Sequence, residues 1–111
     1  MIRARFYENS RHQLCGFSID GHAGFDEYGF DIICSAVSAL ATNTANSIEA
    51  LTGEPMEVES SDGHLRVMVL SLQNGQPCEK AELFLQSLKL GLESVIESYG
   101  SEYLQLSINQ N

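Results

Sequence analysis

The feature that most constrains the fold is a stretch of the chain, residues 32–48, that contains no charged residue. Its larger apolar residues recur at close to the helical period of about 3.6 residues, and the other positions are mostly small or polar. A helix without a charged face is expected to be buried on more than one side, under a sheet or in a contact between subunits. The predicted stripe consists of Ile33, Val37, Leu40, Thr44, Ile48 and Leu51.

Capping signals predict where the helices begin and end. Asp31 suits the N-cap of the first helix, because its carboxylate can accept a hydrogen bond from the backbone N–H of Cys34. Gly53 is a typical stop signal for the same helix. A second amphipathic helix is predicted to open with Pro77 at its first position and to end at Gly100.

Alternation of apolar and polar residues with a period of two predicts five strands. The first two strands and the next two are separated by turn signals, so each pair is expected to form a hairpin. The resulting order is ββαββαβ, which predicts one α+β domain over residues 1–111 with two helices packed on a mostly antiparallel sheet. The strands are expected around Ile2–Phe6, Cys15–Ile19, Met56–Glu59, Leu65–Leu70 and Leu104–Ile108.

Composition excludes several classes of function. With 15 acidic and 6 basic residues the net charge is −9, so direct binding of nucleic acid is not expected. No signal peptide or membrane-spanning segment is visible, which predicts a cytoplasmic protein. Three cysteines do not suggest a disulfide framework, and no closely spaced Cys or His pair suggests a metal site.

A histidine and a cysteine flank a glycine-containing loop. His22, after Gly21, is expected at the end of the second strand, and Cys34 in the first turn of the helix, shortly after Gly29. The start of a helix favours negative charge, so a cysteine there ionises more easily, although the Asp31 carboxylate opposes this unless the cap occupies it. His22 can take the thiol proton, which predicts a cysteine nucleophile with a histidine base.

Neighbouring polar residues offer further roles without selecting one. Asp20 or Asp26 could orient His22 as a third member of the site. Ser38 lies one helical turn after Cys34, where its hydroxyl can bond to the histidine, to a substrate or to its own helix backbone.

These residues resemble a known family, the ribosomal-processing cysteine proteases called Prp. The match consists of Gly21-His22-Ala23, then Gly29, Asp31-Ile32, Cys34 and Ala36-Val37-Ser38, and the length and element order are also similar. The resemblance implies an endopeptidase that removes a short N-terminal extension from a large-subunit ribosomal protein, cutting after a pair of aromatic residues.

The same resemblance implies roles for individual residues. Cys34 would be the nucleophile and His22 the general base. Independently of the resemblance, no cofactor is expected. The resemblance further implies a homodimer and a loop of about residues 23–30 over the site. The residues that would shape the site or bind substrate are Gly21, Ala23, Gly29, Asp31 and Ser38.

Two other interpretations of the cysteines stay open. If Cys34 is a small buried core residue, the chain is a non-catalytic module that binds a basic ribosomal protein through its acidic surface. If Cys34 is a redox sensor, Cys15 or Cys78 must act as the resolving thiol, although Cys15 lies on the apolar face of its strand.

Overall fold

The computed structural model describes residues 1–21 and 28–110, with the backbone alone for residues 28–31. Its five strands form one sheet in the order β3-β4-β2-β1-β5. Neighbouring strands pair antiparallel except β1 and β5, which are parallel. The predicted α+β fold with a mostly antiparallel sheet is therefore confirmed. The strands are β1 (Ile2–Glu8), β2 (Leu14–Asp20), β3 (Met56–Ser61), β4 (His64–Val69) and β5 (Leu104–Gln110).

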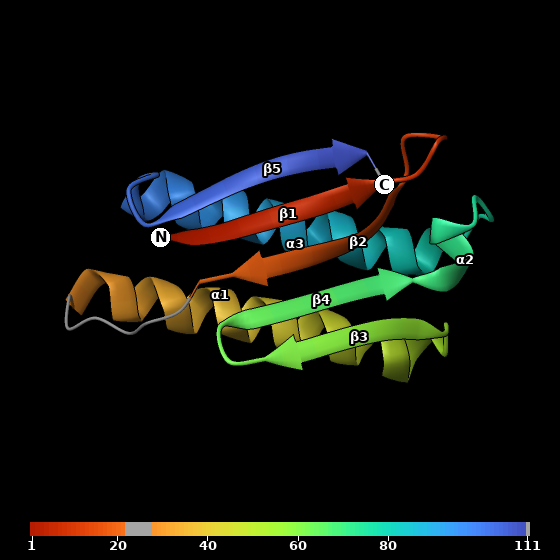
Figure 1. Ribbon diagram of the computed structural model, residues 1–111, viewed down its shortest axis with the longest axis horizontal. Helices are drawn as coiled ribbons and strands as arrows, with labels where there is room; N and C mark the ends of the chain where they lie inside the picture. Colours follow the sequence, from red (N-terminus) through yellow and green to blue (C-terminus); the bar gives the residue numbers. More distant parts are fainter. Residues whose placement is uncertain (22–27, 111) are drawn as a thin grey trace.

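The helices form a second layer on one face of this sheet. Figure 1 shows the two long helices behind the strands, α3 behind β5, β1 and β2 and α1 toward β4 and β3, while the near face of the sheet carries no described helix. Within the described residues, no helix is long and apolar enough to cross a membrane. The helices are α1 (Tyr28–Ser47), the π-helical turn η1 (Ile48–Thr52), α2 (Leu70–Gln73) and α3 (Glu79–Tyr99).

The core lies between the two layers, because alternate strand residues face the helices. Phe6 of β1 and Phe17 of β2 are register partners, fully buried, with ring centroids 6.3 Å apart. Of the stripe predicted for the first helix, Ile33, Val37, Thr44 and Ile48 are buried, so the prediction is confirmed at these positions. The buried helix residues are Ile33, Val37 and Ala41 from α1 and Ala81, Leu85, Leu88 and Leu92 from α3.

Both ends of α1 differ from the prediction. The helix begins at Tyr28, so Asp31 is its fourth residue and the predicted N-cap role is wrong. At the other end the chain widens into η1, and Leu51 is 68% exposed although the stripe predicted it to be buried. A π-helical turn holds an extra residue, which rotates the following residues away from the stripe. Gly53 ends the helix as predicted, in the left-handed conformation with φ 69°.

Two further boundaries depend on contacts that are distant in sequence. The fourth strand ends at Val69, and the unpredicted α2 follows, because Leu72 is fully buried and the Asn9 side-chain amide donates to its carbonyl at 2.8 Å. The last helix begins at Glu79, so Pro77 precedes it and is not its first residue. It ends at Gly100 as predicted.

Two glycines give a paired test of the packing. A Cβ at Gly16 of β2 would overlap the backbone carbonyl of Val67 and the sulfur of Met68, whereas one at Gly91 of α3 would meet only the flexible Leu40 side chain, at 3.2 Å. Gly16→Ala should lower the free energy of unfolding by about 1–3 kcal/mol through overpacking. Gly91→Ala should change it by less than about 1 kcal/mol, because helix propensity offsets the contact. Urea denaturation of both variants measures this, and equal losses would contradict it.

Candidate active site

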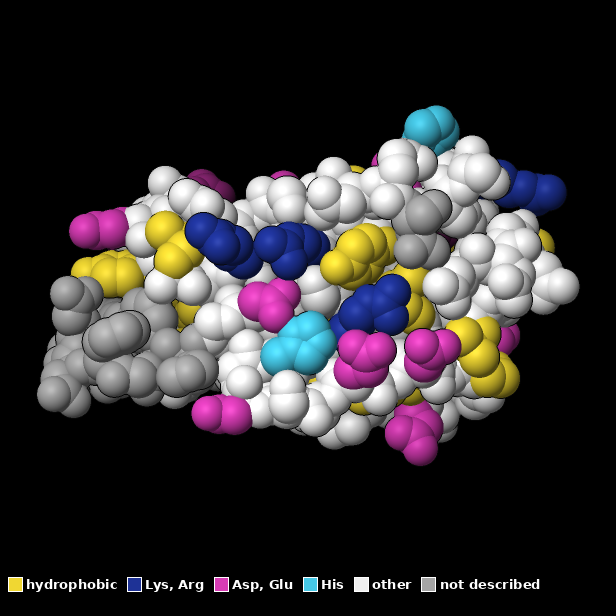
Figure 2. All heavy atoms as spheres, in the orientation of Figure 1, with side chains coloured by type: hydrophobic (Ala, Val, Ile, Leu, Met, Phe, Trp, Pro, Cys, Tyr) yellow, Lys and Arg dark blue, Asp and Glu magenta, His cyan; other side chains and the backbone are white. Residues whose placement is uncertain are grey.

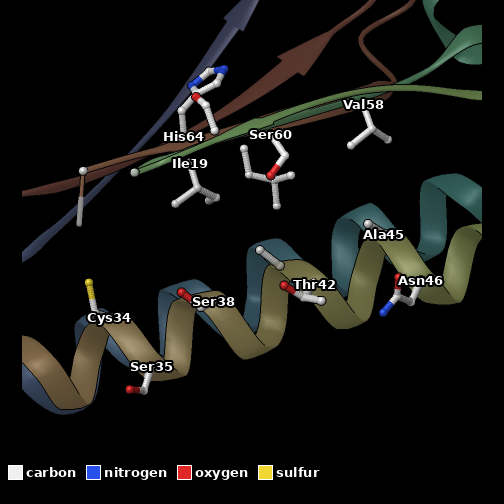
Figure 3. Close-up of a pocket in the computed structure, with 15 residues that line it drawn as sticks. Ile19, Cys34, Ser35, Ser38, Thr42, Ala45, Asn46, Val58, Ser60 and His64 are labelled. Carbon is white, nitrogen blue, oxygen red and sulfur yellow. The ribbon is translucent and has the colours of Figure 1, made fainter. Parts of the chain in front are cut away.

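A cavity of about 640 Å³ opens between α1 and the sheet. Serine, threonine and cysteine side chains of α1 line it, and Ile19 and Val58 of the sheet point toward the helix across the space, while the Ser35 hydroxyl is directed away from the sheet (Figure 3). The lining combines apolar surface with a few polar groups, which is typical of a ligand-binding site. Its residues include Cys34, Ser35, Ser38 and Thr42 from α1 and Ile19, Val58, Ser60 and Leu65 from the sheet.

Cys34 lies on the wall of this cavity, half-buried, with its sulfur directed toward the sheet (Figure 3). The sequence predicted Cys34 in the first turn of the helix. Because α1 begins at Tyr28, Cys34 lies instead in the second turn. The effect of the helix dipole is concentrated in the first turn, so it acts less on this thiol than the sequence suggested. Ser38 follows one turn later and lines the same cavity.

The other two cysteines are placed differently. Cys15 is fully buried in β2, and burial raises the pKa of its thiol to about 11. Desolvation also raises the pKa of Cys78, whose thiol donates to a Glu54 carboxylate oxygen at 3.2 Å. Neither residue lines the cavity that holds Cys34. The prediction that Cys15 belongs to the core is confirmed.

Gly21 lines the same cavity as Cys34. The next residues in the chain, His22 and Ala23, lie outside the described residues, as does Asp26. Gly29 and Asp31 belong to the first turn of α1, and the structure describes their backbone alone. The described part of the chain therefore brings the residue before His22 to the cavity that Cys34 lines.

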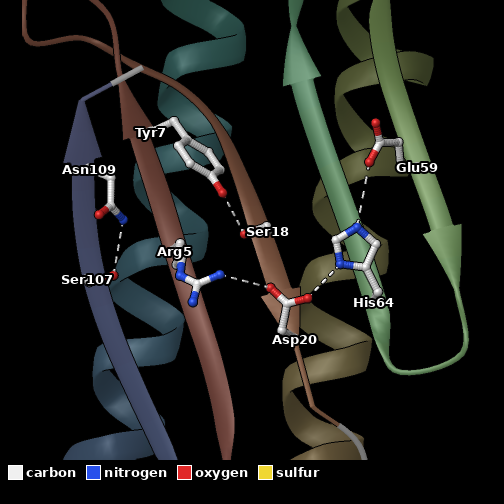
Figure 4. Close-up of polar contacts among 8 residues, drawn as sticks. All are labelled: Arg5, Tyr7, Ser18, Asp20, Glu59, His64, Ser107 and Asn109. Carbon is white, nitrogen blue, oxygen red and sulfur yellow. Dashed lines mark hydrogen bonds and ion pairs between the residues drawn. The ribbon is translucent and has the colours of Figure 1, made fainter.

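His64 is a site residue that the sequence did not indicate. It lines the rim of the cavity from β4, but its ring lies on the outer face of the sheet (Figures 3 and 4). Its Nδ1 is 2.6 Å from Oδ1 of Asp20, and this hydrogen bond raises the pKa of His64. Because the two residues are 44 positions apart, no local pattern links them.

Asp20 is held on that outer face. One carboxylate oxygen bonds to His64, and the other lies 3.4 Å from the Arg5 guanidinium (Figure 4). This carboxylate therefore faces away from the side of the sheet on which Cys34 lies. Among the described residues, no group of three or more His, Cys, Asp or Glu is arranged to hold a metal ion.

Comparison with known proteins identifies a family that matches this chain. The model of the family described as cysteine protease Prp matches residues 1–105. The ribosomal processing cysteine protease Prp of Staphylococcus aureus is 31% identical over 101 residues, which cover 89% of this chain and 92% of that protein.

Two solved structures of the Staphylococcus aureus protease are similar throughout. One is the essential ribosomal processing protease Prp in complex with a substrate peptide, with a TM-score of 0.84 and 29% identity, covering 97% of this chain and 99% of the other. The other holds a covalently linked product peptide, with a TM-score of 0.82 and 30% identity over the same shares of the two chains.

The different settings of the three cysteines predict selective labelling. At pH 7 a thiol with a pKa of about 11 is ionised in only about 10⁻⁴ of molecules, so Cys15 should resist alkylation. Iodoacetamide at pH 6.5 should therefore modify Cys34 first, and peptide mapping by mass spectrometry identifies the site. Raising the pH should increase labelling of Cys78 in particular, because its pKa is raised and it is half-exposed. Faster modification of Cys15 or Cys78 than of Cys34 at pH 6.5 would contradict this expected order of labelling.

Proposed function

The chain belongs to the ribosomal processing cysteine protease family Prp, and from this membership we propose a specific activity for it. The protein removes a short N-terminal extension from a large-subunit ribosomal protein in the cytoplasm, cutting after a pair of aromatic residues. The observation that carries the proposal is that one cavity is lined both by Cys34 and by Gly21, the residue before His22.

The reaction follows from the chemistry of these two residues. His22 takes the proton of the Cys34 thiol, and the thiolate attacks the scissile carbonyl carbon to form a tetrahedral oxyanion. His22 then protonates the leaving amine, the C–N bond breaks, and a thioester remains. Water hydrolyses the thioester and regenerates the thiol. The product peptide linked covalently to the Staphylococcus aureus relative supports an acyl-enzyme of this kind.

The position of Cys34 within α1 limits which groups can donate a hydrogen bond to the oxyanion. The backbone amides that a helix leaves free belong to its first four residues, here 28–31. The backbone amide of Cys34 is within the helix. Ser38 presents a hydroxyl to the same cavity, and we assign it the role of donating a hydrogen bond to the substrate. Gly21, Ala23, Gly29 and Asp31 shape the approach to Cys34.

The substrate peptide fits along α1 beside β3. This strand is at the edge of the sheet, so one side of its backbone is available to pair with an added strand. The cavity follows α1 from Cys34 to Asn46, a distance of about 18 Å at the helical rise. About five extended residues span that distance. Apolar side chains along the cavity suit the aromatic residues of the substrate: Ile19, Ala41, Ala45, Val58 and Leu65.

The charge of the chain supports a basic substrate. The net charge is −9, and acidic side chains gather over β3 on the outer face of the sheet (Figure 2). Glu57 and Glu59 of this strand are exposed, and alternation places them on that face, opposite the cavity that Val58 lines. Such a surface attracts a positively charged ribosomal protein at low ionic strength and raises its association rate.

The protease acts as a homodimer in this proposal. Leu83 and Leu90 of α3 are each 66% exposed and lie on the helix face opposite its buried residues. The adjacent α1 carries no charge from Ile32 onward. Exposed apolar residues on a helical layer with a charge-free neighbour suit a contact between two copies.

Cleavage of a peptide with an aromatic pair tests the enzyme assignment. Cys34→Ala should lower kcat/KM at least about 10³-fold, because no other group forms the thioester, while fluorescence polarisation still detects peptide binding. Cys78→Ala is the matched control and should keep full activity. Full activity of Cys34→Ala would exclude the mechanism, and equal cleavage of a peptide whose aromatic pair is replaced by alanine would exclude the specificity.

Light scattering after gel filtration tests the dimer. The double variant Leu83→Glu, Leu90→Glu should be a monomer where the wild type is a dimer, because two charges would be buried in the contact. The matched control is Gln105→Glu, Ser107→Glu, at two exposed positions of β5 in the sheet. Dissociation in the control alone, or in neither variant, would contradict this surface.

A further inference from the structure

Two contacts join the end of β2 to the β3–β4 hairpin, just before His22 in the sequence. Asp20 and His64 are the last register partners between β2 and β4. One residue further, the Gly21 N–H donates to the Gly63 carbonyl at 3.0 Å. These two contacts form a side-chain tie and a backbone tie between the same two segments.

The side-chain tie belongs to a row of charges on the outer face of the sheet (Figure 4). Asp20 lies between Arg5 of β1, at 3.4 Å, and His64 of β4, at 2.6 Å. His64 also lies 3.7 Å from Glu59 of β3 through its other ring nitrogen. Four neighbouring strands are thus linked through one histidine and one aspartate. Both side chains are about one-third exposed, 32% and 34%, so solvent weakens the ion pairs without removing them.

Gly21 has little freedom to move independently of this tie. Its φ is +103°, and a Cβ at this position would overlap the carbonyl oxygen of Met1. The N-terminus therefore packs against Gly21, and the Gly63 carbonyl accepts a hydrogen bond from its N–H. The position of Gly21 therefore depends on the placement of the β3–β4 hairpin.

We propose that His64 is a positioning residue for the reaction at Cys34: through Asp20 and Gly21 it holds the end of β2, and with it the wall of the cavity that Cys34 lines. This inference rests on the proposed function, since it assigns His64 a part in that reaction. Gly21, Gly63, His64 and Cys34 all line one cavity, so a displacement of the hairpin changes the approach to the thiol. A misplacement of about 1 Å at a reacting pair can lower a rate about 10²-fold.

The tie depends on pH in a defined direction. The groups that face His64 are Asp20 and Glu59, with Arg66 on its own strand and Arg5 and Arg3 beyond Asp20 on β1. The carboxylates raise the pKa of His64, so the imidazolium persists above its ordinary range. The stabilisation that charged His64 supplies is fully present just below the ordinary pKa of histidine, and it is lost as the pH rises through the raised pKa of folded His64. Both stability and the alkaline limb of activity should fall over that interval.

The experiment compares four variants of the intact protein. His64→Ala removes the tie, His64→Gln keeps an uncharged donor, and Asp20→Asn removes the charge of the partner. His12→Ala is the matched control, because His12 also pairs with a glutamate, Glu8 at 3.7 Å, but it is 78% exposed in the β1–β2 turn. The measurements are kcat and KM on the aromatic-pair peptide, the pH dependence of Cys34 alkylation, and thermal stability at pH 6 and pH 8.

We expect His64→Ala to lower kcat at least tenfold with KM within about threefold, because peptide binding does not use the tie. His64→Gln should have a kcat between those of His64→Ala and the wild type. The part of the activity decrease at alkaline pH that is due to His64 should be absent in this variant. Asp20→Asn should resemble His64→Ala. His12→Ala should match the wild type in all three measurements.

A purely structural role would give a different pattern. If His64→Ala and His64→Gln lower thermal stability but leave kcat and the alkylation profile unchanged, the proposal is overturned. Failure of the proposed function is recognised separately, because then the wild type does not cleave the peptide or His22→Ala cleaves it normally. In that case the pH profile of Cys34 alkylation still decides whether His64 acts on the site, and an unchanged profile overturns the inference.

Discussion

The structure depends on β2 being paired on both sides and buried under the helices. β2 is antiparallel to β1 and to β4, and Phe17 on its inner face is fully buried against Phe6. Removal of a buried phenylalanine typically costs about 3–5 kcal/mol, so this strand cannot shift without loss of the fold. Its fixed position carries Gly21 to the cavity beside α1.

The same arrangement places the three cysteines in different environments. Cys15 lies within the central strand, where burial raises its pKa to about 11, and Cys78 precedes α3, where desolvation and Glu54 raise its pKa. Cys34 is on the helix wall that borders a peptide-sized cavity next to an open sheet edge. Of the three cysteines, Cys34 is the one that lines this cavity between α1 and the sheet.

The sheet also has two faces with different functions. Its inner face packs the core and lines the cavity, while its outer face carries Arg5, Asp20, His64 and Glu59 in a row across four strands. Alternation along a strand sends adjacent side chains to opposite faces, so one strand end serves both. Asp20 can therefore hold the hairpin on one face while Gly21, the next residue, borders the site on the other.

The amino-acid sequence by itself determined the α+β order, the five strands, the two amphipathic helices and the stops at Gly53 and Gly100, because periodicity and capping are local properties. The local motif around Cys34 also sufficed to indicate the family, which the comparisons confirmed. Only the tertiary structure decided that η1 turns Leu51 outward, that Cys34 lies in the second helical turn, and that His64 ties the end of β2. Such features depend on contacts between residues far apart in the chain, and no local pattern encodes those contacts.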